Sequence, residues 1–202
     1  YPFAAEIVKN IPIYDGDALR ALFASDDTAF PVLSELNRVF LTGPGIIAIR
    51  GGYEDIGLID EVTAALSGII AAEEAASGGR GDHFAAAGAN SRVWNAHEKR
   101  AVRDPELFAR YNANEIVRRV SEAWLGSGYQ ITTQVNVVRP GGKAQTPHRD
   151  YHMGFQTEET LRYYPVSQHA LSASLTLQGA VAHSEMPLES GPTKLLPYSQ
   201  SY

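Results

Sequence analysis

A short motif, Thr146-Pro147-His148-Arg149-Asp150, follows a strand-like run over residues 129–139 and a Pro140-Gly141-Gly142 break. Side chains of an extended segment alternate between two faces, so His148 and Asp150 point the same way and Arg149 points to the opposite side. An imidazole beside a carboxylate supplies two ligands of the two-histidine, one-carboxylate set, which suits non-haem Fe(II). We therefore predict that His148 and Asp150 bind a metal ion and are catalytic. The alternative is a surface ion pair at the end of a strand.

Two segments after the motif have the composition of strands. Residues 170–181 alternate apolar and polar side chains, and residues 191–199 contain Gly191-Pro192-Thr193 followed by Leu196-Pro197-Tyr198-Ser199. Together, the run over 129–139, the His148-Arg149-Asp150 motif and the Gly191-Pro192-Thr193 segment resemble, in this order, the phytanoyl-CoA dioxygenase family. The resemblance covers roughly residues 129–200.

The resemblance implies an α+β fold built on a double-stranded β-helix, the jelly-roll barrel that cupins also have, flanked by N-terminal helices. We expect a single domain over residues 1–202, with a mainly helical layer over 1–128 and the barrel core over 129–202. The family places its second metal-binding histidine beyond the Gly191-Pro192-Thr193 strand, followed by an arginine that holds 2-oxoglutarate. We therefore expect the third ligand, with the C-terminal part of the barrel, to follow Tyr202.

The chain contains one alternative for the third ligand, His183. Lys194 follows it at almost the spacing of the family's arginine, although His183 precedes the Gly191-Pro192-Thr193 strand. Core or surface roles are expected for His83, His97 and His169. If the strand continues, His152 shares the parity of His148 and Asp150, which would place it beside the metal ligands or facing the substrate. The favoured alternative is a histidine on a solvated loop.

The resemblance also implies an activity. Members of the family are Fe(II)- and 2-oxoglutarate-dependent dioxygenases, so we expect hydroxylation of a small organic molecule by O2 with release of succinate and CO2. Related halogenases replace the carboxylate at the position of Asp150 with a small residue, and its presence here favours hydroxylation. The alternatives are a non-oxidative, cupin-like metal enzyme and a non-catalytic β-barrel binding protein. A protein kinase is excluded because Phe155 stands where the kinase His-Arg-Asp loop requires asparagine.

Polar side chains share one face of the run that precedes the motif. Gln134 and Asn136 point to the side opposite the valines at 135 and 137. One interpretation is a cavity in which Gln134 and Asn136 hydrogen-bond 2-oxoglutarate. The other is an antiparallel sheet with one solvated face.

Two groups of side chains are candidates for substrate contacts. The first is aromatic and lies on a predicted loop over 151–165, and its members are Tyr151, Phe155, Tyr163 and Tyr164. It indicates either an aromatic-lined substrate pocket or a loop packed on the barrel rim. The second is basic and consists of Arg92, His97, Lys99 and Arg100. It is interpreted as a solvated face, or as a contact for an acidic group of the substrate.

Composition limits the class of protein. With 202 residues, 44% of them hydrophobic, the chain is long enough for one sizeable core. The formal charge of −6 argues against a nucleic-acid or anionic-membrane partner. The longest apolar stretch, residues 64–76, is interrupted by Glu73 and Glu74, so no membrane span is predicted. The chain has no cysteine, so a metal site must use histidine and carboxylates. The cysteine count says little about the compartment, and a cytoplasmic enzyme is the default expectation.

The N-terminal half has mainly helical patterns. Apolar spacing predicts helices over residues 15–26, 54–76, 104–111 and 114–125. Gly43-Pro44-Gly45 predicts a turn into a short buried strand over 46–49. Residues 77–91, rich in small side chains, are expected to form a mobile loop or lid.

Overall fold

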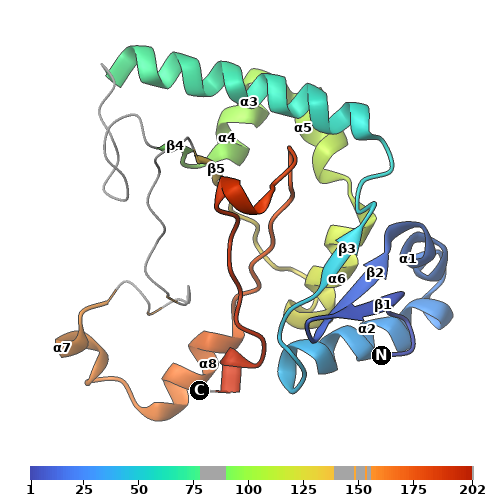
Figure 1. Ribbon diagram of the computed structural model, residues 1–202. Coiled ribbons are helices and arrows are strands. Elements are labelled where there is room, and N and C mark those ends of the chain that lie inside the picture. Colours follow the sequence, from blue (N-terminus) through green and yellow to red (C-terminus); the bar gives the residue numbers. More distant parts are fainter. Residues whose placement is uncertain (78–89, 139–147, 149–152, 154–155, 202) are drawn as a thin grey trace.

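The computed structural model describes residues 1–77, 90–138, 148, 153 and 156–201, and it is a mixed α+β structure with two small open sheets (Figure 1). In chain order the elements are β1 (Glu6–Val8), β2 (Ile11–Asp15), α1 (Gly16–Phe23), α2 (Asp26–Leu41), β3 (Ala48–Arg50), α3 (Ile56–Ser77), β4 (Asn90–Val93), α4 (Ala96–Arg103), α5 (Pro105–Asn112), α6 (Glu115–Leu125), β5 (Val135–Val138), α7 (Glu158–Leu161), α8 (Val166–Ser174) and the 3-10 turns η1 (Leu188–Ser190) and η2 (Ser199–Ser201). None of the described helices is long and apolar enough to cross a membrane.

The first sheet has the strand order β1-β2-β3, with β1 antiparallel and β3 parallel to β2. The β1–β2 hairpin turns through Lys9 and Asn10, whose φ angles of 50° and 68° fit a type I′ turn. Helix α1 follows β2 at once, and the Asp15 carboxylate caps it by accepting a hydrogen bond from the Ala18 N–H at 2.9 Å. A Cβ atom at Gly16 would overlap the carbonyl oxygen of Gly51, so the approach of α1 to the end of β3 requires glycine.

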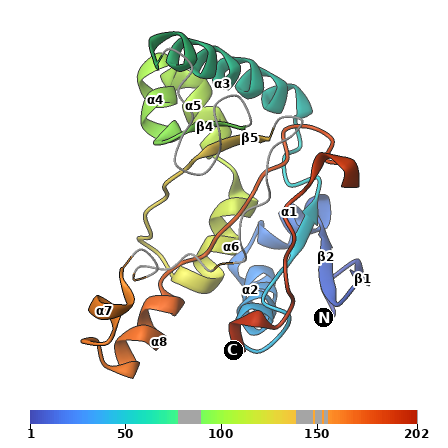
Figure 2. The same cartoon turned by 60° about the vertical axis from the view of Figure 1, so that its left-hand side comes forward.

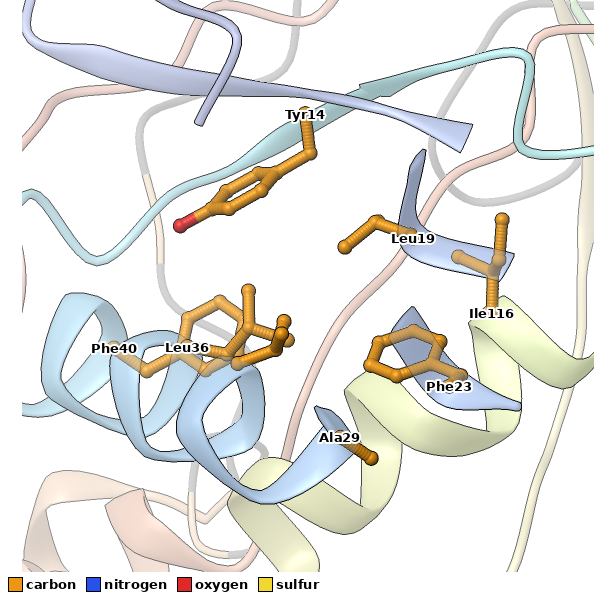
Figure 3. Packing of buried hydrophobic residues seen from close by; sticks show 8 residues of the cluster. Tyr14, Leu19, Phe23, Ala29, Leu36, Phe40 and Ile116 are labelled. Atoms are coloured by element: carbon orange, nitrogen blue, oxygen red, sulfur yellow. The ribbon is translucent and has the colours of Figure 1, made fainter. Parts of the chain in front are cut away.

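The first hydrophobic core lies between this sheet and helices α1, α2 and α6. In Figure 3, Tyr14 of β2 lies above Leu36 and Phe40 of α2, while Phe23 of α1 faces Ile116 of α6. A hydrogen bond also joins helices α2 and α6: the Asn37 side-chain amide donates to the Ala123 carbonyl at 2.9 Å. This core is built mainly from residues of the first 50 positions, and later sequence adds Ile116, Val120, Ala123 and Trp124 of α6 together with Leu177.

The second hydrophobic core lies under α3. Apolar residues of α3 at helical spacing, Leu58, Val62, Leu66 and Ile69, pack with Val93, Ala96 and Leu107. The short antiparallel β4–β5 sheet contributes to this core through Val93, which is buried in it, and Val135, which is opposite Val93 and packs against it. Figure 1 shows α3 lying across α4 and α5.

Helices α7 and α8 lie away from α3, α4 and α5 in both views (Figures 1 and 2). Ser172 is the only buried residue that these two described helices contain. After α8 the chain runs back to the N-terminal part of the molecule, where Tyr198 and Gln200 form hydrogen bonds with the turn between α2 and β3. The Tyr198 N–H donates to the Pro44 carbonyl at 2.8 Å, and the Gln200 amide donates to the Gly43 carbonyl at 2.7 Å.

The sequence-based helix predictions over 15–26, 54–76, 104–111 and 114–125 are confirmed as α1, α3, α5 and α6. The strand predicted after Gly43-Pro44-Gly45 is present as β3, but none of its residues is buried, so the expectation of a buried strand was wrong. Within the described residues 129–138 of the predicted run, only Val135–Val138 form a strand. Most of the predicted lid over 77–91 lies outside the described residues.

Two strand predictions in the C-terminal third are wrong. Residues 170–181 begin in helix α8 and continue without regular structure. The segment 167–175 has no β-branched residue and includes the helix formers Ala170, Leu171 and Ala173, so propensity outweighs the alternating pattern. Residues 191–198 form no strand, and Pro192 and Pro197 each lack the N–H that a sheet ladder needs. The mixed α+β class is confirmed, but the strands of the described residues form a three-stranded and a two-stranded open sheet, not a closed barrel.

Candidate functional site

The predicted metal ligands occupy the segment after β5. His148 is a described residue and its side chain is exposed to solvent. Asp150 lies outside the described residues. Among the described residues, no group of three or more histidines and carboxylates is close enough to hold a metal ion. The pairing of His148 with Asp150 therefore remains a prediction from their spacing.

The polar residues predicted to contact 2-oxoglutarate lie on or beside β5. Asn136 is in β5 opposite Arg92 of β4, and Gln134 precedes the strand. Both side chains are exposed, whereas Val135 between them packs against the second core. The predicted division of this strand into a polar and an apolar face agrees with these three positions but not with Val137, which is 40% exposed although it shares the side of Val135. Contact with 2-oxoglutarate stays a prediction.

His183, the alternative third ligand, is held between α3 and α5. Its Nδ1 lies 2.9 Å from the Thr63 hydroxyl oxygen and its Nε2 lies 2.8 Å from the Tyr111 hydroxyl oxygen. Thr63 already donates its single hydroxyl hydrogen to the Ile59 carbonyl at 2.7 Å. It follows that His183 donates from Nδ1 to Thr63 and accepts at Nε2 from Tyr111. Burial, helped by the nearby charge of Arg100, lowers the pKa of His183 and favours this neutral form.

Both ring nitrogens of His183 are thus engaged in hydrogen bonds within the helical layer. A metal ion at Nε2 would have to displace the Tyr111 hydroxyl, because the acceptor lone pair is already used. In this arrangement, His183 is a structural residue that ties the C-terminal segment to α3 and α5. This role was not predictable from sequence, since Thr63 and Tyr111 are distant from His183 in the chain.

The predicted basic cluster separates into residues with different environments. Lys99 is half-buried and forms an ion pair with Glu73 at 2.5 Å. Arg100 is buried, with only 5% of its surface exposed, so the solvated-face interpretation is wrong for this residue. Its guanidinium lies over the Tyr111 ring at 4.6 Å, and its Nη2 is 3.3 Å from His97 Nδ1. For Arg92, only its backbone place in β4 opposite Asn136 is described.

Aromatic stacking extends this buried group. The rings of Tyr53 and Tyr111 are stacked at 5.0 Å, and the Tyr53 hydroxyl donates to the Tyr111 carbonyl at 3.1 Å. Burial raises the pKa of both phenols, so they remain protonated hydrogen-bond donors at neutral pH. Burial also lowers the pKa of the Arg100 guanidinium, which nevertheless stays charged.

The other predicted residues are dispersed. Tyr163 and Tyr164 are exposed, while Tyr151 and Phe155 lie outside the described residues. Helix α7 occupies part of the segment expected to be a loop, and His169 of α8 is joined to it through an Nε2 contact with the Leu161 carbonyl at 3.1 Å. His83 and His152 also lie outside the described residues.

Comparison with known proteins identifies the family. The family model for phytanoyl-CoA dioxygenase (PhyH) matches residues 42–202, which is well over half of the 202 residues. The match confirms the resemblance found over 129–200, includes His148 and Asp150, and extends upstream to the turn before β3. Neither curated proteins nor solved structures give a match. The chain belongs to the phytanoyl-CoA dioxygenase (PhyH) family.

Proposed function

We propose that this protein is an Fe(II)- and 2-oxoglutarate-dependent dioxygenase that hydroxylates a small organic molecule. The observation that carries the proposal is the family match over residues 42–202, together with the His148-Arg149-Asp150 motif inside it. The family in general consists of oxygenases of this kind. The substrate and the position that is hydroxylated belong to the proposal.

The donor set of the chain fits iron. Because the sequence contains no cysteine, the protein offers nitrogen and oxygen ligands, and imidazole with carboxylate is the combination that non-haem Fe(II) oxygenases use. The exposed imidazole of His148 is accessible to an incoming ion. When bound, the metal would supply activation of O2 for oxidation of a C–H bond, coupled to decarboxylation of 2-oxoglutarate to succinate and CO2.

The residues of this chain would position the reactants. In the proposed site His148 and Asp150 hold the metal, and Asp150 supplies a negative charge that favours a divalent cation. Gln134 and Asn136, on the exposed face of β5, would donate hydrogen bonds to a carboxylate of 2-oxoglutarate. A double-stranded β-helix around these residues is part of the same proposal, because the family resemblance supports it.

Anaerobic titration with Fe(II) and 2-oxoglutarate tests this function. The oxygenase should develop a visible charge-transfer absorption only when both are present, since 2-oxoglutarate must bind to the metal itself. A non-oxidative metal enzyme would bind Fe(II) without a band that depends on 2-oxoglutarate. A non-catalytic binding protein would give no band under any condition, and either of these results would overturn the proposal.

A further inference from the structure

The most unusual side chain among the described residues is Arg100, a buried cation without a carboxylate partner. It lies in α4, is only 5% exposed, and forms no ion pair with any described acidic residue. Burying a guanidinium normally requires a counter-charge, because removing the charge from water is unfavourable. The rings of Tyr111 and Phe108, at 4.6 and 5.9 Å from the guanidinium carbon, offset only part of that cost.

The hydrogen-bonding capacity of Arg100 is also largely unused. Its Nε and Nη1 atoms are buried and have no acceptor within the described part of the chain. Only Nη2 has a neighbour, the His97 Nδ1 atom at 3.3 Å. Buried N–H groups are nearly always paired in native proteins, so unpaired donors on a buried cation point to an acceptor that binds from outside.

A cavity of about 170 Å³ is lined by Arg100, and the rest of its wall comes from α3, the α4–α5 junction and α5. Its apolar wall is formed by Ala65 and Ile69 of α3 with Leu107 and Phe108 of α5. Ile69 and Arg103 also line a wider groove of about 480 Å³ between α3 and α4. The cavity and the open groove are therefore adjacent, which provides a route from solvent.

The charge of the cavity wall is positive. Arg103 lies against Gly68 of α3, where a Cβ atom would be only 3.2 Å from its Nη2, and it adds a second guanidinium. The acidic residue in the lining, Asp104, already accepts the Leu107 N–H at 2.9 Å as the N-cap of α5. An anion entering the cavity would meet two arginines and a carboxylate that is occupied with helix capping.

We propose that this cavity binds a small organic carboxylate, with its carboxylate on Arg100 and its hydrocarbon part against Ile69, Leu107 and Phe108. The planar guanidinium matches a carboxylate in a bidentate geometry, and the apolar wall favours a ligand with a short carbon chain over an inorganic anion. The site requires no iron. It is thus a function separate from the proposed oxygenase chemistry and is testable in the presence of a metal chelator.

Nuclear magnetic resonance titration of the protein with butanoate in EDTA tests the proposal. Binding should be saturable and should shift the Nε–H signal of Arg100, which is identified by its loss in Arg100→Met. Arg100→Met keeps the apolar length of the side chain but removes the charge, and it should weaken binding about ten- to a hundredfold. Butan-1-ol, which has the same carbon chain without charge, and inorganic phosphate should each bind much more weakly than butanoate.

Two further variants make the result specific. Ala65→Phe fills the cavity from α3 while leaving Arg100 in place, and it should also abolish binding. Arg110→Met removes an exposed arginine of α5 that pairs with Glu61 at 2.7 Å, and it should leave binding unchanged. Should Arg100→Met fail to fold, Ala65→Phe carries the test alone. The proposal is overturned by undiminished butanoate binding in Ala65→Phe or in a folded Arg100→Met, by no saturable binding, or by equal binding of phosphate or butan-1-ol.

Discussion

The Tyr111 hydroxyl donates a hydrogen bond to His183 Nε2 across 2.8 Å, and this joins the C-terminal segment to the helical layer. The same imidazole donates to Thr63 of α3, so one neutral side chain links three parts of the molecule. The link depends on His183 having a lone pair at Nε2. Protonation of the ring would replace that acceptor with a second donor facing a hydroxyl group.

Stability should consequently depend on pH through His183. Its pKa in the folded protein is lowered from the ordinary value of 6.5, because burial and the charge of Arg100 disfavour the imidazolium. The unfolded chain then binds more protons below pH 6.5, so the contribution of His183 is complete above that pH and is lost as the pH falls toward the lowered folded pKa. Urea unfolding of wild type and His183→Gln from pH 7.5 to 4.5 measures this.

The difference between the stability profiles of wild type and His183→Gln gives the contribution of His183 alone. His97 also has a lowered pKa, from burial and from Arg100, but its contribution remains in both proteins. We expect wild type to lose more free energy of unfolding than His183→Gln as the medium is acidified. Parallel stability profiles would contradict the assigned hydrogen-bond arrangement.

Tyr14→Phe should destabilise the first core. The Tyr14 hydroxyl donates to the buried Glu35 carboxylate at 3.0 Å, and that carboxylate oxygen also accepts the Phe3 N–H at 3.3 Å. Removing the hydroxyl leaves a buried acceptor less satisfied, which costs about 1–3 kcal/mol. Chemical denaturation gives the free energy of unfolding. The exposed residue Tyr163 supplies the control, since Tyr163→Phe should change stability by less than about 0.5 kcal/mol.

Gly16→Ala should be destabilising because the new methyl group would meet the backbone of Gly51. A backbone carbonyl is less able to move aside than a flexible side chain, and overpacking of this kind costs about 1–3 kcal/mol. Gly52→Ala in the adjacent turn is the matched control, because its Cβ would have only Ile49 at 3.9 Å. In thermal unfolding, the melting temperature of Gly16→Ala should be well below those of wild type and Gly52→Ala. Equal melting temperatures would show that α1 does not need the close approach of Gly16 to Gly51.

Asp150→Ala should abolish Fe(II)-dependent conversion of 2-oxoglutarate to succinate, since it removes the only carboxylate in the proposed ligand pair. The control is Asp60→Ala, which removes an exposed aspartate of α3 and should leave turnover intact. Succinate is measured by chromatography under air with added Fe(II). Undiminished succinate formation by Asp150→Ala would refute the ligand assignment.

Helices were predictable where spacing and capping agreed. Asp104 and Asn114 each precede an apolar periodic segment, and each caps its helix in the structure through a hydrogen bond of 2.9 Å. Helix α2 was missed, and its sequence contains Pro31, a residue that usually ends a helix. The strand prediction failed over residues 170–178 because alternation of apolar and polar residues on a short span does not exclude a helix.

The family and the motif were also predictable, because both depend on residue type and order. The environment of Arg100 was not. In sequence it belongs to a basic cluster that a solvated helix face would also produce, and its burial arises only where α3, α4 and α5 meet. The role of His183 likewise depends on Tyr111, which is brought to it by the packing of α5 against α3.

The contact between Gln200 and the turn after α2 has a consequence for the order of folding. Gln200 and Gly43 are separated by 157 positions, whereas the first core is assembled mostly from residues 14–40. Contacts of such high sequence separation carry a large loop-closure cost. We therefore expect the Gln200–Gly43 contact to form late in folding, after the first core has formed. Gln200→Ala should therefore accelerate unfolding and leave the refolding rate nearly unchanged. Stopped-flow kinetics measure both rates. Slower refolding of the variant would show that the Gln200–Gly43 contact is already formed in the transition state. The contact of Gln200 with the turn after α2 would then slow the unfolding of the N-terminal core without helping it to fold.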